Sequence, residues 1–113
     1  MNYKDKILYQ SNYWYNDGLR KAQIRDLSGA ILSLRKSLQY NRENIAARNL
    51  LGLVYYGRGE IAEALVEWII SKNLKAHDNI ANYYIENVRS SQSELEAYNQ
   101  AVKKFNQCLT YCE

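Results

Sequence analysis

The sequence predicts an all-α chain built from antiparallel helical hairpins, about six helices in all. The 113 residues contain no proline and only 5 glycines, so the residues that most often break helices are nearly absent. Apolar residues recur at spacings of three and four, the spacing of one helix face. Residues of the same class also recur at one fixed offset of 34. A chain of this length is expected to form a single domain, residues 1–113.

The 34-residue offset joins pairs of residues that are alike in size or polarity. The pairs are Gly18 and Gly52, Asp26 and Glu60, Leu27 and Ile61, Ala30 and Ala64, Ile31 and Leu65, Leu34 and Trp68, Ser37 and Ser71, and Tyr40 and Leu74. A fixed offset of this length is typical of helical repeat proteins. Two antiparallel helices pack closely only where small residues lie at their crossing. We therefore expect Gly18 and Gly52 at helix crossings.

These residues resemble the pattern of the tetratricopeptide repeat family. Trp14 stands at the aromatic position that opens the family's first helix, and Tyr55 stands at a later tyrosine position. The small, bulky and small positions of the second helix are matched by Ala30, Leu34 and Ser37, and again by Ala64, Trp68 and Ser71. The resemblance covers units at about 11–44 and 45–78, with a degenerate third unit at 79–113. It implies a right-handed superhelix of hairpins, an α-solenoid.

Six residues depart from the family pattern. Asp17 and Lys21 replace residues that are usually apolar in the first unit. The proline that usually closes each unit is replaced by Arg42 and Ala76. In the third unit Asn82 and Glu86 stand where an aromatic and a small residue are expected.

The helix boundaries follow from caps and turns. The first helix is expected from Tyr3 or Ser11 to Ile24, and the second from Leu27 to Tyr40 with Asp26 as N-cap. The third is expected from Ile45 to Arg58, with Asn44 as its N-cap, and the fourth from Glu60 to Leu74. The Gly57–Gly59 segment is predicted to be the turn between these two helices.

The fifth helix is expected from Ile80 to Arg89, and a last helix from about residue 94 to Tyr111. Ser93 and Glu96 form a predicted capping box that opens the last helix. That helix carries an apolar seam with steps of three and four: Leu95, Tyr98, Val102, Phe105, Leu109 and Cys112.

Two registers are open for the last helix. In one, Ala101, Phe105 and Cys108 copy Ala30, Leu34 and Ser37 and make it the second helix of the third hairpin. In the other, Phe105, Leu109 and Cys112 open a further hairpin, and residues 1–113 are the N-terminal part of a longer array.

The sequence carries no pattern that favours catalysis. His77 is the single histidine, and no glycine-rich phosphate-binding loop is present. Cys108 and Cys112 stand four apart, but a zinc site needs about four ligands and His77 is the only other soft one. We expect no catalytic residue, no metal and no cofactor, and we do not expect an enzyme.

Charge and hydropathy limit the classes of partner that we expect. The net charge of +3 is small, and acidic residues lie among the basic ones, so we expect solvated helix faces and no nucleic-acid binding. No apolar run approaches the ~18 residues that span a bilayer. The first residues lack the apolar stretch of a signal peptide, which predicts a cytoplasmic protein.

The resemblance implies a concave groove, lined by the first helix of each hairpin, that holds an extended or helical peptide. The predicted groove residues are Tyr15, Asn16, Leu19, Asn49, Leu53, Tyr56, Tyr83, Tyr84 and Asn87. Asparagine both donates to and accepts from a peptide backbone, and tyrosine offers a large contact area at low entropic cost. The family mode that grips a C-terminal carboxylate is not expected, because Tyr15 and Leu19 stand where it needs lysine.

The sequence therefore predicts a non-catalytic protein–protein interaction module, a scaffold whose partner is a protein or peptide of unknown identity. The alternative function is structural self-association through the helix at 94–112, whose seam would join two copies into a homodimer.

Overall fold

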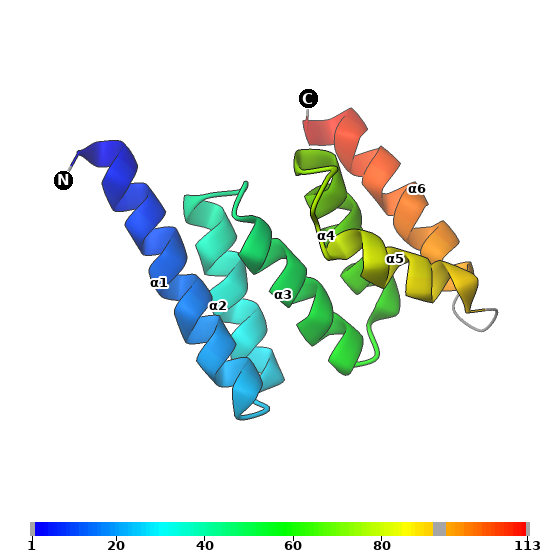
Figure 1. The fold of residues 1–113 in the computed structure, drawn as a ribbon, viewed down its shortest axis with the longest axis horizontal. Coiled ribbons are helices and arrows are strands. Elements are labelled where there is room, and N and C mark those ends of the chain that lie inside the picture. The colour runs from blue at the N-terminus through cyan, green and yellow to red at the C-terminus, as the bar shows by residue number, and fades with distance from the viewer. Residues whose placement is uncertain (1, 92–94, 113) are drawn as a thin grey trace.

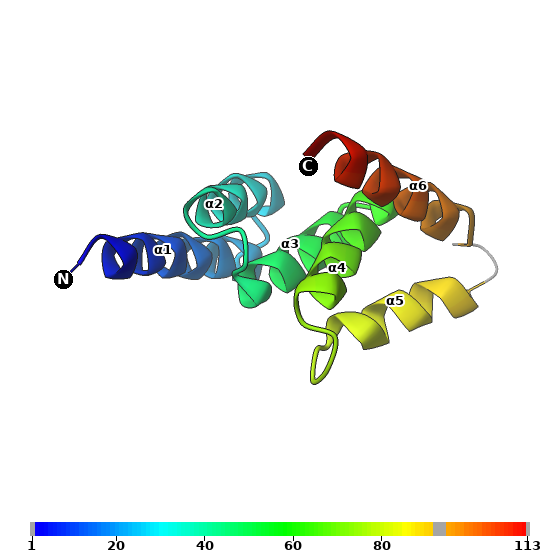
Figure 2. The same cartoon turned by 90° about the horizontal axis from the view of Figure 1, so that it is seen from above.

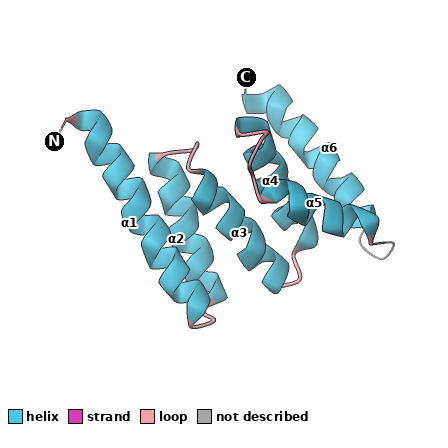
Figure 3. Cartoon of the chain, in the orientation of Figure 1, coloured by secondary structure: helices cyan, strands magenta, loops and turns pink. Residues whose placement is uncertain are grey.

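The computed structural model describes residues 2–91 and 95–112, with side chains in 2–91 and 98–107. Within these ranges the chain forms six α-helices and no strand (Figure 1; Figure 3). The helices are α1 (Tyr3–Gln23), α2 (Leu27–Tyr40), α3 (Ile45–Gly57), α4 (Ile61–Leu74), α5 (Ala81–Ser90) and α6 (Leu95–Cys112). The all-α prediction is confirmed, and α1 begins at the earlier of its two expected starts.

Side-chain caps explain why three of the helices begin where they do. The Asn2 side-chain oxygen accepts a hydrogen bond from the Asp5 N–H at 2.8 Å. Asp26 accepts from the Gly29 N–H at 3.0 Å, and Asn44 accepts from the Ala47 N–H at 3.1 Å. The predicted caps Asp26 and Asn44 are thus confirmed. The predicted capping box at Ser93 lies outside the described residues.

The turn between α3 and α4 needs a glycine. Gly59 has φ +81, in the left-handed region that side chains disfavour, and Gly57 is the last residue of α3. The predicted turn is therefore confirmed at Arg58 and Gly59, whereas Gly57 still belongs to α3.

Glycines lie at the crossings of the first two hairpins. A Cβ on Gly18 would lie 2.7 Å from Leu34 Cγ, and a Cβ on Gly52 would lie 2.1 Å from Trp68 Nε1. Leu34 and Trp68 are themselves 34 residues apart. The repeat seen in the sequence therefore corresponds to one helix-crossing contact used twice.

Five of the six described helices line two sides of the molecule, and α4 lies between α5 and α6. Figure 2 shows α1, α3 and α5 along one side, with α2 and α6 along the other. α1 packs extensively on α2 and α3 on α4, while α2 packs on α3. α6 departs from this scheme, because it packs mainly on α4 and touches α5 much less.

Ala101 marks the face of α6 that packs inward. It is 0% exposed, as are Ala30 and Ala64 in α2 and α4. Lys104 adds an ion pair from α6 to α4, its Nζ lying 2.9 Å from Glu63 Oε1. The burial of Ala101 agrees with the first register considered for the last helix, whereas the sparse packing of α6 on α5 does not. The second register depends on Leu109 and Cys112, whose side chains lie outside the described residues.

The two charged departures in α1 pair with each other. Lys21 Nζ lies 2.8 Å from Asp17 Oδ2, and the buried Ser33 hydroxyl donates to the same oxygen at 2.6 Å. The Lys21 ammonium, and next the Ser33 hydroxyl, lower the pKa of Asp17 to about 2. An ion pair thus occupies the edge of α1 where the family pattern has apolar residues.

Candidate functional site

Four of the predicted groove residues meet at one hollow. Leu53 and Tyr56 of α3 and Tyr84 and Asn87 of α5 line a pocket of about 170 Å³. The remaining two lining residues are Trp68 of α4 and Val88 of α5. We call this hollow the Trp68 pocket. Because its walls come from three helices, only the packed structure creates it.

Trp68 lies buried beneath the pocket and is hydrogen-bonded there. Its side chain is 2% exposed, and its Nε1–H donates to the Asn49 carbonyl at 3.2 Å. Gly52, one turn away from Asn49, leaves the space that the indole ring occupies. A buried indole fixed by a hydrogen bond and by close packing does not need to be ordered by a ligand.

Two tyrosine rings flank the indole. The Tyr56 and Trp68 ring centroids lie 6.1 Å apart with an interplanar angle of 35°. The Trp68 and Tyr84 centroids lie 5.1 Å apart with an angle of 38°. Both separations fall in the range of favourable aromatic pairs. The three rings form one aromatic cluster that joins α3, α4 and α5.

The rim of the pocket combines apolar surface with one amide. Leu53 is 39% exposed and Tyr56 is 41% exposed, so part of each side chain faces solvent. No lining residue is charged. The Asn87 side-chain amide is exposed and makes no hydrogen bond to any described residue. The pocket can therefore bury an apolar group and exchange hydrogen bonds beside it.

Asn49 lies in the interior instead of facing a ligand. It is only 9% exposed, and its Nδ2 donates to Asn79 Oδ1 at 2.9 Å. The Asn79 amide in turn donates to Ser71 Oγ at 2.9 Å. Asn49 thus belongs to a buried polar junction between α3, the end of α4 and the start of α5.

The remaining predicted groove residues lie away from the pocket or at its edge. Tyr83 is exposed, and its ring meets the Tyr84 ring edge-on at a centroid distance of 6.1 Å. On α1, Tyr15 packs against the hydrophobic core, Leu19 is half-buried and Asn16 is exposed. None of these lines the pocket.

Trp68 and Val88 line the pocket but were not among the predicted site residues. Trp68 lies on α4, the second helix of its hairpin. It stands where the repeat pattern has a bulky residue, which indicated a core residue and not a lining residue. Gly52 was the feature of the sequence that could have identified Trp68 as a lining residue. A glycine that faces a tryptophan across a helix pair lets the indole ring lie close to the backbone of the neighbouring helix.

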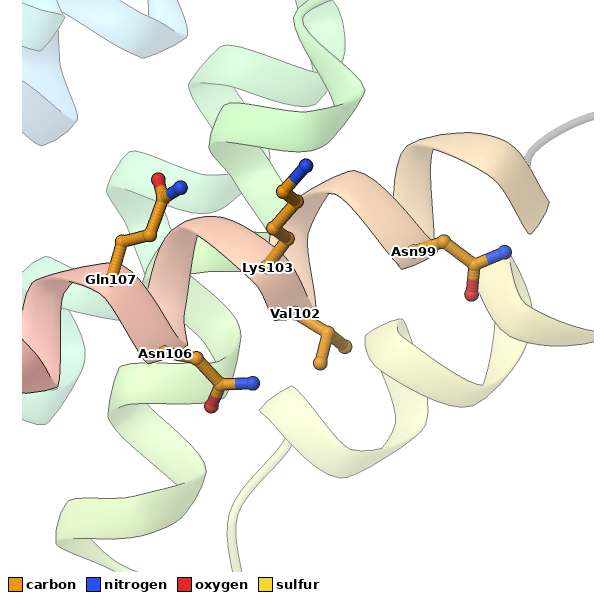
Figure 4. A pocket seen from close by; sticks show the side chains of 5 residues that line it. All are labelled: Asn99, Val102, Lys103, Asn106 and Gln107. Carbon is orange, nitrogen blue, oxygen red and sulfur yellow. The ribbon is translucent and has the colours of Figure 1, made fainter.

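A second hollow lies on α6 (Figure 4). Its lining residues, Asn99, Val102, Lys103, Asn106 and Gln107, all belong to this one helix. In Figure 4 Lys103 and Gln107 point to one side of the helix, while Val102 and Asn106 point to the other. These side chains do not converge on a common point, so this hollow is a weaker candidate.

The predicted self-association seam lies partly against the body of the protein. Tyr98 packs against the hydrophobic core, and Val102 and Phe105 are half-buried. The side chains of Leu95, Leu109 and Cys112 lie outside the described residues.

Two of the basic side chains stack on aromatic rings. Arg35 lies over the Tyr55 ring, 5.6 Å from its centroid, and donates to the Tyr55 hydroxyl. Lys36 Nζ lies 4.2 Å from the centroid of Trp14. These cations therefore take part in packing on α1, α2 and α3.

Among the described residues, no cluster of three or more His, Cys, Asp or Glu side chains could hold a metal ion. None of the helices, as far as they are described, is both long and apolar enough to cross a membrane. Comparison of the chain with protein-family models, curated proteins and solved structures finds no match.

Proposed function

We propose that this chain is a non-catalytic protein–protein interaction module that holds a segment of a partner protein on the face formed by α3 and α5. The observation that carries the proposal is the Trp68 pocket. There, Leu53 and Tyr56 meet Tyr84 and Asn87 across more than one helix. The tetratricopeptide resemblance of the sequence, which implies a peptide groove on this side of the hairpins, includes these four residues among the nine that it predicts.

The chemistry of the pocket suits a peptide. Tyrosine and tryptophan contribute most of the energy at many protein interfaces, because they bury large areas at low entropic cost. A free asparagine amide can bond to a peptide N–H or carbonyl. Together they provide an apolar contact and a polar contact side by side.

Self-association through α6 ranks below this proposal. α6 places Ala101 and Tyr98 against the rest of the protein, so part of its apolar face is already covered. Light scattering after size exclusion, over a range of concentrations, tests this alternative. A dimer that Phe105→Glu converts to folded monomers would favour the seam over the pocket.

The interaction module can be tested with a displayed library of random peptides selected on the wild-type protein. The test variant is Leu53→Lys, which places a charge in the pocket at an exposed helix position. The matched control is Leu32→Lys, the same change at a 68% exposed leucine on α2. We expect selected peptides to lose binding to Leu53→Lys by tenfold or more, about 1.4 kcal/mol, and to bind Leu32→Lys as they bind the wild type.

Equal binding to both lysine variants would move the binding surface away from α3 and α5. A failure to select any peptide above background would refute the proposed function in its peptide-binding form.

A further inference from the structure

We propose that the Trp68 pocket recognises an uncharged side chain of phenylalanine or leucine size, presented by a partner whose backbone bonds to the Asn87 amide. This inference rests on the proposed function and names the chemistry of the partner. It follows from the size of the pocket, from the state of the charges around it, and from the position of Asn87.

The size of the pocket sets the size of the group it can bury. Its volume of about 170 Å³ is close to the ~150 Å³ of an apolar cavity that binds benzene. A phenyl ring or a branched four-carbon group fills such a space, whereas an alanine methyl leaves most of it empty.

The charged residues that neighbour the lining residues in the sequence pair with each other on the exposed surface. Arg89 Nη1 lies 3.8 Å from Glu86 Oε2, on either side of Asn87 and Val88 in the sequence. Arg58 Nη2 lies 3.6 Å from Glu60 Oε1, just beyond Tyr56. With no charged residue in the lining itself, a charged partner group would lose its hydration without gaining a counter-ion. The pocket therefore favours a neutral side chain.

Asn87 supplies the polar contact that orients the partner. It is exposed on α5 next to Val88, which is buried beneath the pocket. Its amide offers a donor and an acceptor, the pair that an extended peptide backbone presents in return. A side chain inserted over Trp68 brings its own backbone to this rim.

The closing experiment uses small probes and the folded full chain. The probes are N-acetyl-phenylalaninamide and N-acetyl-leucinamide, with N-acetyl-lysinamide and N-acetyl-aspartamide as charged counterparts. Binding is followed by ¹H–¹⁵N NMR at the Trp68 indole N–H and the Asn87 side-chain amide. Trp14, which lies on α1 beneath Lys36, is an internal control in every spectrum.

We expect the two neutral probes to shift the Trp68 and Asn87 signals and to leave the Trp14 indole unchanged. The charged probes should bind at least about tenfold more weakly because their desolvation is not compensated. Raising the salt from about 50 mM to about 500 mM should change the affinity of the neutral probes by less than about twofold.

The apolar contact in the pocket and the hydrogen bond to Asn87 are tested separately, each with one variant and one matched control. Leu53→Lys should abolish the Trp68 shift, whereas Leu32→Lys should retain it. Asn87→Ala should weaken binding by about threefold to tenfold, the effect of one lost hydrogen bond, and Asn16→Ala on α1 should not weaken it.

The inference is wrong if the charged probes bind as tightly as the neutral ones, or if Trp14 shifts together with Trp68. It is also wrong if no probe shifts Trp68 while selected peptides still bind in a way that depends on Leu53. That last result would leave the proposed function standing. If neither probes nor peptides bind at this face, both proposals fail.

Discussion

The first two helix pairs, α1–α2 and α3–α4, differ from the last pair, α5–α6, in the residues at which their helices cross. In α1–α2 and α3–α4 a glycine lies at the crossing, Gly18 or Gly52, and a large side chain from the second helix packs directly on it. The residue that continues this series at an offset of 34 is Glu86 on α5, and it is exposed. A glutamate cannot provide the flat surface that a glycine provides, and α6 packs mainly on α4 instead of closing on α5.

This difference between the helix pairs explains how the Trp68 pocket forms. α5 packs on α4, and its residues Ala81, Ile85 and Val88 are buried. Ala81, Ile85 and Val88 are 34 residues beyond Ala47, Leu51 and Val54 of α3. α5 thus repeats the inward face of α3 but not its glycine. The pocket lies where a regular pair meets this irregular one.

The largest expected effect tests the glycine crossing. Gly52→Leu should prevent folding, because even a Cβ would lie 2.1 Å from Trp68 Nε1, and moving the buried indole would break its hydrogen bond to the Asn49 carbonyl. Gly52→Ala should destabilise the protein by about 1–3 kcal/mol. Thermal and urea unfolding followed by circular dichroism measure both effects.

Gly57→Ala is the matched control within the same helix. Its Cβ would lie 3.8 Å from Leu27 Cδ1, an ordinary contact, so stability should stay within about 1 kcal/mol of the wild type. If Gly52→Ala and Gly57→Ala melt at the same temperature, the crossing is not the contact that closes α3 on α4.

An intermediate effect separates the two regions. Ala101→Arg puts a long charged side chain where α6 meets α4 with no exposed area, at a local cost of about 1–3 kcal/mol. Hydrogen exchange followed by mass spectrometry should show faster exchange in α6 and unchanged protection in α1–α4. Faster exchange throughout the chain would instead mean that α6 and the first two hairpins unfold as one unit.

The smallest effect concerns the ion pair on α1. Because the pKa of Asp17 is lowered to about 2, below the ~3.9 of an unfolded chain, its carboxylate favours the folded state. Its contribution is fully present above about pH 4 and is lost as the pH falls toward about 2. Asp17→Asn should therefore cost roughly 1 kcal/mol or less at neutral pH and almost nothing near pH 2.

Urea unfolding of the wild type and Asp17→Asn at several pH values measures this difference. Lys21→Met should raise the pKa of Asp17, because Lys21 is the main cause of the shift, and should move the loss of stability to higher pH. A wild-type advantage that does not change between pH 7 and pH 2 would contradict the ion-pair explanation.

Part of the candidate site could be predicted from the sequence. Leu53, Tyr56, Tyr84 and Asn87 were found because they fall on the helix faces that the repeat places on one side. Asn49 has the same spacing but is buried, since Asn79 from a distant part of the chain supplies its hydrogen bond. Helical spacing assigns a residue to a face, and the neighbouring elements decide whether that face meets solvent.

What the sequence determined by itself is local or periodic. The helices, the caps Asp26 and Asn44 and the glycines at the crossings follow from preferences within a few residues and from one recurring offset. The tertiary structure alone decided that α6 packs on α4 and that Trp68 lies beneath a pocket between α3 and α5. These depend on which apolar faces best fill the space that neighbouring helices leave, and that fit is a property of packed surfaces, not of any one segment.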